Sequence, residues 1–362
     1  MERVAIYPYS KAYEPVVMHQ NLIPDMEIVS LISPKGWGLS GDIITTPDST
    51  LTIHSDFSGS LDNCTVVWFV EDNLISLPDE LLYTKVKETV EKSKKIIFTR
   101  YSNKDLLKKC EMIIPSPLMV DQDRFLSNQN IFIKEKLYDI NTPVIFVMGV
   151  SENTDKYAVQ ISLREQFMNR GYRVSSISTR RDSGILGLHP TPDFMLESTD
   201  SEEDKILKYN HFVKQIELEE QPEIIIIGIP GGIFPYNRKL HNRFGTMTFK
   251  IANALKCDCA VLCSLCVDSK REYFDEVAKG LSHKYDIDVL FHHVAAVMKD
   301  GLADQLNEYE FRLLSLDEHF VKERMKDWKR SDVYYALDEG DAYRMTEDII
   351  DTLSNVMTMP LV

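Results

Sequence analysis

Short apolar runs that alternate with helical stretches constrain the fold of this chain most strongly. In the first third, the stretch at 77–95 has apolar residues near helical spacing and lies between two of these runs. Strands that alternate with helices predict a parallel sheet covered on both faces. We therefore expect residues 1–120 to form a small Rossmann-like α/β domain. Its expected strands are 3–8, 27–34, 64–71, 94–100 and a short fifth one at 110–117.

The same alternation continues after a polar connector at 121–141. It predicts a second α/β domain over 142–316, with three layers and a mainly parallel sheet, followed by a helical tail at 317–362. A helix is expected at 155–171, because its apolar residues suit one packed face, and another at 202–221. The expected strands are 143–149, 172–179, 222–232, 259–267 and 286–295.

The charge balance narrows the possible partners. The formal net charge is −15, so the chain offers no broad basic surface for a nucleic acid or an anionic membrane. No apolar run approaches the roughly 18 residues that cross a bilayer, and the N-terminus lacks a signal-peptide core. We expect a cytoplasmic protein whose partners are a small anionic ligand, a peptide or other proteins, with a homo-oligomer left open.

Four of the six cysteines gather in "CDCAVLCSLC". One interpretation is a metal or iron–sulfur site, and the other is a buried strand that uses cysteine as a small hydrophobe. Cys263 and Cys266 are three apart and so face opposite ways within one strand, and no zinc-site spacing fits. We favour the buried strand. The cysteines concerned are Cys257, Cys259, Cys263 and Cys266.

The segment "MGVSENTDKYAVQ" at 148–160 resembles a phosphate-binding loop between a strand and a helix. Backbone N–H groups at a helix N-terminus are unpaired and carry partial positive charge, and a lysine adds a full charge. The strict spacing of such loops is not kept, so a solvated lysine at a helix start is the alternative. The expected ligand-binding residues here are Gly149, Ser151, Asn153, Thr154, Lys156 and Tyr157.

Basic residues and glycines also follow the other predicted strands. Carboxyl ends of parallel strands share one edge, which is where an open α/β sheet binds its ligand, and arginine suits phosphate or carboxylate. The alternative is that these charges are simply solvated. His189 is a candidate base or acyl-transfer participant, or else an anchor for its loop; with Lys156 and Arg180 it completes the catalytic candidates. The further ligand-binding candidates are Arg180, Arg181, Gly231, Gly232, Arg238 and Arg243.

Two other polar clusters receive structural interpretations. "STDSEED" at 198–204 matches no calcium loop, and Ser, Thr or Asp before a helix is a capping signal. His292 and His293, near the end of the last predicted strand, are expected to be partly buried structural histidines.

Taken together, the motifs resemble those of known families. The loop at 148–160, the strand "GYRVSSIST" and the strand "IIIIGIPGGIFP" resemble the dethiobiotin synthetase branch of P-loop proteins. "STRRDSGIL" (178–186), Asp193–Phe194 and "CDCAVLCSL" (257–265) resemble a related family that includes D-glutamate N-acetyltransferases. Over most of residues 1–316 the chain is similar to peptide maturation system proteins of anaerobic natural-product clusters.

The resemblance also identifies departures from the P-loop pattern. Asp155 takes the place of a glycine, Tyr157 replaces the Ser or Thr that binds Mg²⁺, and Ile227 or Gly228 stands where an acid for magnesium is expected. Phosphoryl transfer thus lacks its usual electrostatic support. The resemblance implies binding of ATP or acyl-CoA, with the role of Mg²⁺ open, and group transfer to a peptide or amino acid. The alternative is a non-catalytic partner protein with a decayed nucleotide fold.

Overall fold

The fold is known from a computed structural model. It describes residues 1–71, 77–99, 103–120, 136–180, 182–196, 198–235, 239, 244–266, 272–300 and 312–357. The chain divides into two compact units, one comprising Met1–Asn128 with Arg181–Pro190 and the other Gln129–Arg180 with Thr191–Val362. The expected second domain included residues 181–190, which instead belong with the first unit. No described helix has both the length and the apolarity needed to span a bilayer.

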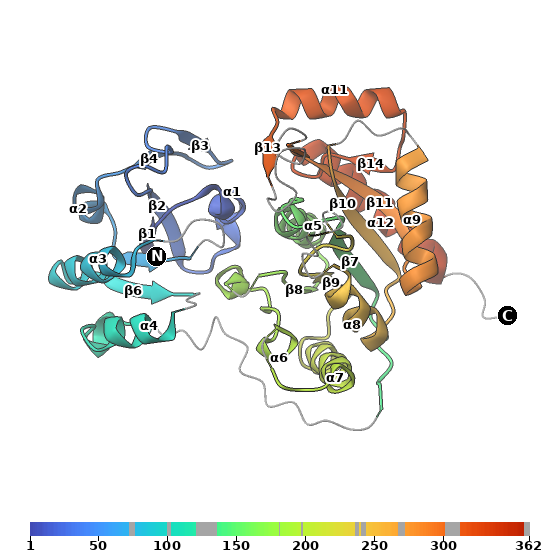
Figure 1. The fold of residues 1–362 in the computed structure, drawn as a ribbon, viewed down its shortest axis with the longest axis horizontal. Helices are drawn as coiled ribbons and strands as arrows, with labels where there is room; N and C mark the ends of the chain where they lie inside the picture. Colours follow the sequence, from blue (N-terminus) through green and yellow to red (C-terminus); the bar gives the residue numbers. More distant parts are fainter. Residues whose placement is uncertain are drawn as a thin grey trace. The chain divides into compact units, whose positions relative to one another are not determined.

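The first unit is built on a six-stranded sheet in the order β3-β4-β2-β1-β5-β6 (Figure 1). All neighbouring strands are parallel except β3 and β4, which form an antiparallel pair. Helices α2, α3 and α4 pack apolar side chains against one face of the sheet. The strands are β1 (Glu2–Tyr7), β2 (Met26–Ile32), β3 (Ile43–Thr45), β4 (Thr50–His54), β5 (Val66–Phe69) and β6 (Lys95–Phe98). The α-helices are α1 (Glu14–Met18), α2 (Phe57–Ser60), α3 (Asp79–Glu91) and α4 (Lys104–Glu111).

One local prediction for this unit was wrong, and two strands were missed. The strand expected at 110–117 does not form, because Asn103 caps α4 by accepting a hydrogen bond from the Leu106 amide (3.0 Å), and the helix runs to Glu111. Strands β3 and β4 were missed, because each buries too few side chains to give an apolar run.

The second unit contains a six-stranded sheet in the order β14-β11-β10-β7-β9-β8, and all its strands are parallel. The α/β class predicted for both units is therefore confirmed. The expected helical tail also contributes the edge strand β14. The strands are β7 (Val144–Gly149), β8 (Val174–Ile177), β9 (Ile224–Gly228), β10 (Cys259–Leu265), β11 (Val289–Ala295) and β14 (Val333–Tyr334), with a separate antiparallel pair β12 (Val297–Lys299) and β13 (Leu313–Ser315).

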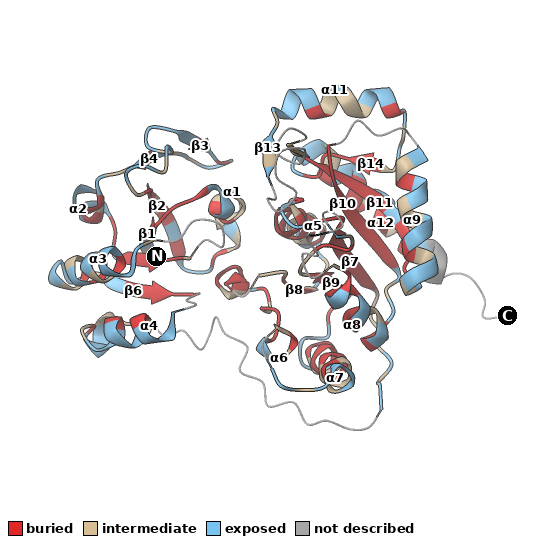
Figure 2. Ribbon diagram, viewed as in Figure 1, coloured by how far each residue is buried: buried red, intermediate tan, exposed pale blue. Residues whose placement is uncertain are grey.

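Helices cover both faces of this sheet and give the unit three layers. One apolar cluster joins α5 and α12 to one face, and another joins α7, α8 and α9 to the other face. Figure 2 shows the strands between these helices as buried and the outer surfaces of α9 and α11 as largely exposed. The helices are α5 (Lys156–Asn169), α6 (Asp193–Leu196), α7 (Glu202–Glu220), α8 (Thr246–Ala254), α9 (Glu272–Tyr285), α11 (Glu318–Trp328) and α12 (Glu339–Met357).

The cysteine-rich segment is a buried strand, as predicted. Cys259 and Cys263 are buried in β10, and all six cysteines of the chain are free thiols. Cys263 packs in the cluster with α5 and α12, whereas Cys266 packs with Phe274 of α9 in a different cluster. Among the described residues, no group of three or more His, Cys, Asp or Glu side chains is arranged to hold a metal ion.

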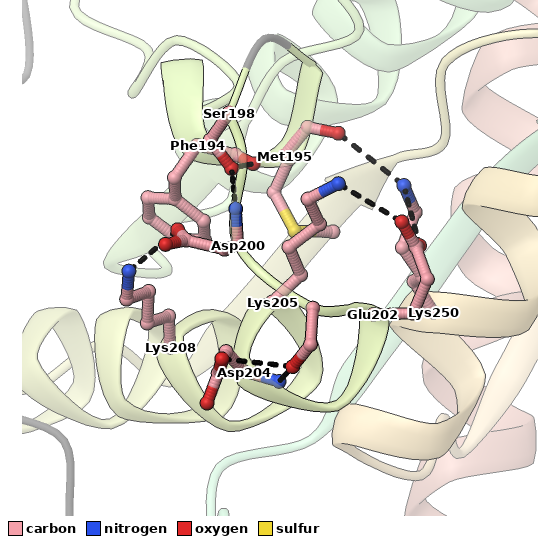
Figure 3. Close-up of polar contacts among 10 residues, drawn as sticks. Phe194, Met195, Ser198, Asp200, Glu202, Asp204, Lys205, Lys208 and Lys250 are labelled. Carbon is pink, nitrogen blue, oxygen red and sulfur yellow. Dashed lines mark hydrogen bonds and ion pairs between the residues drawn. The ribbon is translucent and has the colours of Figure 1, made fainter.

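The acidic segment before α7 is a helix cap, also as predicted. The Ser201 hydroxyl accepts a hydrogen bond from the Asp204 amide (3.0 Å) and donates one to the Asp204 carboxylate (2.8 Å). Figure 3 labels Asp204 and draws its contacts as dashed lines. Such a reciprocal pair satisfies an amide that the helix itself leaves unpaired. The neighbouring Glu202 carboxylate accepts from the buried Lys205 ammonium (2.9 Å) and lies 3.2 Å from the Lys250 ammonium.

Candidate functional site: the loop between β7 and α5

The candidate site lies where the central strand of the second unit ends. Strand β7 is flanked by β9 and β10. After β7 the chain forms β8 and β9 on one side of it and then crosses to the other side to form β10, so the direction of strand order reverses at β7. Ligands in open parallel sheets bind at such a reversal, beyond the carboxyl ends of the strands. The loop at 150–155 starts there, with the Val150 amide bonded to the Cys263 carbonyl of β10 (2.9 Å).

The backbone of this loop curls through two left-handed residues. Asn153 has φ 56° and Asp155 has φ 59°. Residues other than glycine rarely adopt this region, and Asn and Asp are among those that tolerate it. Asp155 thus keeps the backbone conformation that glycine favours at this place, although its side chain differs.

The backbone of this loop offers several consecutive N–H groups as hydrogen-bond donors. In the part of the chain that the structure describes, the backbone N–H groups of residues 151–156 have no hydrogen-bond acceptor. The first helical bond runs from the Val159 amide to the Asp155 carbonyl (2.9 Å). Consecutive amides that curl at a helix N-terminus form a concavity of positive partial charge, which suits an anion.

Lys156, the first residue of α5, is folded into this curl. Its side chain is buried, and its Nζ donates to the Ser151 carbonyl (2.9 Å), its one acceptor among the described residues. The Thr154 hydroxyl donates to the same carbonyl (3.1 Å). Burial lowers the pKa of Lys156, because an ammonium without water is costly. The lysine therefore points into the loop and holds it closed, with donor capacity left over.

Two glycine positions allow the loop to pack so tightly. A Cβ on Gly149 would lie 2.3 Å from the Thr154 hydroxyl oxygen and 2.9 Å from the Ser151 carbonyl oxygen. A Cβ on Gly232, in the turn after β9, would lie 2.7 Å from the Ser151 Cα. That turn, whose Gly231 has φ +83°, is tied to the loop by a bond from the Ile233 amide to the Gly149 carbonyl (3.0 Å). The structure thus brings Gly232 of the turn against the loop, whereas a Cβ on Gly231 would meet nothing within 4 Å.

Arg180 lies beside Tyr157, the second residue of α5. Its guanidinium carbon is 4.8 Å from the centroid of the Tyr157 ring, and the ring is buried. Such stacking holds a guanidinium in place and is worth about 0.5–2 kcal/mol. The arrangement places a second fixed cation near the N-terminus of α5.

Behind the loop lies a row of residues that the sequence analysis did not assign to the site. Across neighbouring strands, Cys263 of β10 pairs in register with both Gly149 of β7 and His293 of β11. His293 is fully buried, and its Nε2 lies 3.6 Å from the Asp155 carboxylate. Burial raises the pKa of the Cys263 thiol, so the thiol stays protonated. A histidine near the end of an apolar strand was the available signal, but its partner Asp155 is apparent only once the sheet order is known.

The remaining predicted residues are not joined to this site by the structure. His189 is half-buried and belongs to the first unit. Three arginines of the predicted set, Arg181, Arg238 and Arg243, lie outside the described residues.

Comparisons with known proteins support the fold. A DUF1611 family protein from Anabaena variabilis is similar over 98% of this chain and 100% of its own, with a TM-score of 0.60 and 13% identity. At this identity the likeness shows the fold alone, and it extends over both units. No protein-family model and no curated protein matched the chain.

Two nucleotide-bound structures show weaker likeness. Cobyrinic acid a,c-diamide synthase from Mycobacterium smegmatis, with bound ADP and magnesium, covers 61% of this chain and 99% of its own, with a TM-score of 0.35 and 12% identity. A nucleotide-binding protein from Archaeoglobus fulgidus in complex with ADP covers 60% and 92%, with a TM-score of 0.30 and 14% identity. Scores this low carry no argument about this chain.

Proposed function

We propose that the second unit binds a phosphate-bearing small molecule at the loop between β7 and α5. The observation that carries this proposal is the run of backbone N–H groups at residues 151–156 without acceptors, next to the buried Lys156 ammonium. A bound phosphate would accept from these amides and would compete with the Ser151 carbonyl for Lys156. Arg180 adds a further positive charge near the helix N-terminus.

The ligand we propose is a nucleotide such as ATP, or an acyl-CoA, and the further role is transfer of a group to a peptide or amino acid during natural-product maturation. Lys156 and Arg180, which both belong to the second unit, are the residues we propose to take part in that transfer. These finer assignments follow from the family resemblance of the sequence. Binding itself stands on the loop geometry and does not depend on them.

The second candidate function is non-catalytic: the chain would act as a partner of other maturation proteins. One observation favours it: Lys156 and Thr154 both donate to the Ser151 carbonyl, so the loop is held closed by its own side chains. In a decayed site this closure would be permanent. In a working site the ligand would open it, because phosphate oxygens accept hydrogen bonds from an ammonium more strongly than a carbonyl does.

A thermal-shift screen with ATP, ADP, acetyl-CoA and coenzyme A separates the two functions. A ligand at a hundredfold excess over its Kd adds about 2.7 kcal/mol of stability. We expect at least one of these compounds to raise the Tm of the wild type and to leave Lys156→Met unshifted. Lys256→Met, which removes a largely exposed lysine, is the matched control and should shift like the wild type.

If none of the four compounds shifts the wild type, the binding proposal is wrong. The partner function is then tested by a pull-down against the other proteins of the same maturation cluster.

A further inference from the structure

The two positions at which a P-loop protein normally holds Mg²⁺ do not fit a cation in this chain. The first follows the loop lysine and is occupied here by Tyr157, whose buried ring lies under the Arg180 guanidinium at 4.8 Å. A phenol on a ring covered by a fixed cation does not replace an aliphatic hydroxyl as a magnesium ligand. The guanidinium would also repel a divalent cation at that place.

The second position is the end of β9, where the chain has Gly228. A Cβ there would lie 2.5 Å from the Gln160 carboxamide oxygen and 2.7 Å from the Thr179 methyl carbon. Gln160 is fixed, because its Nε2 donates to the Ile177 carbonyl (2.6 Å) and the Ile226 carbonyl (3.3 Å). The space that an acidic side chain would need is thus filled by a neutral amide.

The positive charge beside the loop comes instead from side chains. Lys156 lies within the curl and Arg180 is stacked on the adjacent Tyr157. A diphosphate that carries no metal has more negative charge for these two cations to neutralise than the same diphosphate chelated to Mg²⁺. Chelation would also bring a dication next to an ammonium and a guanidinium, in a site that is partly shielded from water.

We infer that the site takes its phosphate ligand in the metal-free form, with Arg180 supplying the positive charge that Mg²⁺ supplies in P-loop proteins. This inference rests on the proposed phosphate binding and narrows it to ligands with an unchelated diphosphate. ADP and coenzyme A both carry that group and represent its two sources, a nucleotide and an acyl carrier.

Isothermal titration calorimetry with each ligand tests the inference, once in EDTA and once in excess MgCl₂, with ionic strength matched by NaCl because screening alone weakens such contacts. ADP is expected to bind at least threefold more tightly in EDTA. Arg180→Gln is expected to weaken binding in EDTA by roughly tenfold, as for the loss of one charge-assisted hydrogen bond, and to abolish the preference for EDTA. Arg173→Gln, which removes a mostly exposed arginine just before β8, is the control.

The outcomes distinguish the two proposals. Binding that requires Mg²⁺ or is strengthened by it overturns the inference but leaves phosphate binding intact. An Arg180→Gln protein that binds as tightly as the Arg173→Gln protein also overturns it. Failure of both ligands in both buffers shows that the proposed function itself is wrong. A response to one ligand alone, with the EDTA preference, supports the inference and identifies the source of the diphosphate.

Discussion

The carboxylate of Asp155 faces the ring of His293, with 3.6 Å between Oδ2 and Nε2. His293 Nδ1 accepts a hydrogen bond from the Ala336 amide (3.0 Å), so the neutral ring carries its proton on Nε2, toward the carboxylate. The charge of Asp155 is thereby directed to the β11 side of the loop. It still lies beside the amides that would bind an anion and opposes that binding.

Replacing Asp155 by Asn should therefore strengthen phosphate binding. Asn tolerates the left-handed backbone at this position, and removal of one negative charge near the ligand should lower the Kd for ADP by roughly three- to tenfold. Calorimetry measures the Kd. The matched control is Asp286→Asn, because Asp286 is also left-handed (φ 55°) but largely exposed and outside the loop. Equal effects of the two substitutions, or weaker binding by Asp155→Asn, would contradict the role given to Asp155.

Gly149→Ala should disrupt the loop because no space exists for a methyl group. The new Cβ would clash with the Thr154 hydroxyl at 2.3 Å and with backbone at 2.9 Å. We expect a loss of about 1–3 kcal/mol in the free energy of unfolding and loss of ligand binding. Urea denaturation and calorimetry measure the two effects.

Gly280→Ala is the matched control for that substitution. Gly280 lies in α9, and a Cβ there would meet nothing within 4 Å. Alanine in a helix is favoured over glycine, so this variant should gain roughly 0.5–1 kcal/mol. A Gly149→Ala protein that binds ADP normally would show that the loop is not packed as described.

The pH dependence of stability should contain a contribution from His292. Burial lowers its pKa to about 4, with smaller effects of Asp332, Arg330 and Asp275. Because the unfolded chain binds this proton more tightly than the folded chain, stability is lost as the pH falls from about 6.5 to about 4, by on the order of 3 kcal/mol at most. His292→Leu should remove this component from the urea midpoints measured across that range.

Replacing an exposed histidine in the same way provides the comparison for His292. His283→Leu in α9 should keep the acid slope of the wild type. Identical slopes for the wild type and His292→Leu would mean that His292 is not held neutral by its surroundings.

Ser201→Ala should affect stability but not the ligand. It removes the acceptor for the Asp204 amide at the start of α7, which costs about 1 kcal/mol. The Kd for ADP should stay unchanged, since the cap lies at another helix. A changed Kd together with unchanged stability would reverse both expectations.

Local signals in the sequence were sufficient for most of the fold. The runs that became β7, β9 and β10 are almost entirely apolar because both faces of a parallel sheet are covered, so their burial was predictable. The loop at Gly149 and Lys156 was also found, since a glycine and a lysine between a strand and a helix are local features.

Long-range relations were not accessible in this way. The proximity of Asp155 and His293 depends on the strand order, in which β10 alone separates β11 from β7. The position of the Gln160 carboxamide next to Gly228 depends on how α5 packs over β8 and β9. The placement of residues 181–190 with the first unit likewise involves contacts with residues more than a hundred positions away, such as the bond from the Tyr13 hydroxyl to Asp182 (2.7 Å).

Calorimetric titration of wild type and Lys156→Met with ADP in EDTA tests the central claim most directly, alongside urea denaturation of both proteins. We predict that the wild type binds, that Lys156→Met does not, and that the variant is at least as stable, because it no longer buries an ammonium with one acceptor. A well-folded Lys156→Met protein that binds ADP as tightly as the wild type would contradict the account.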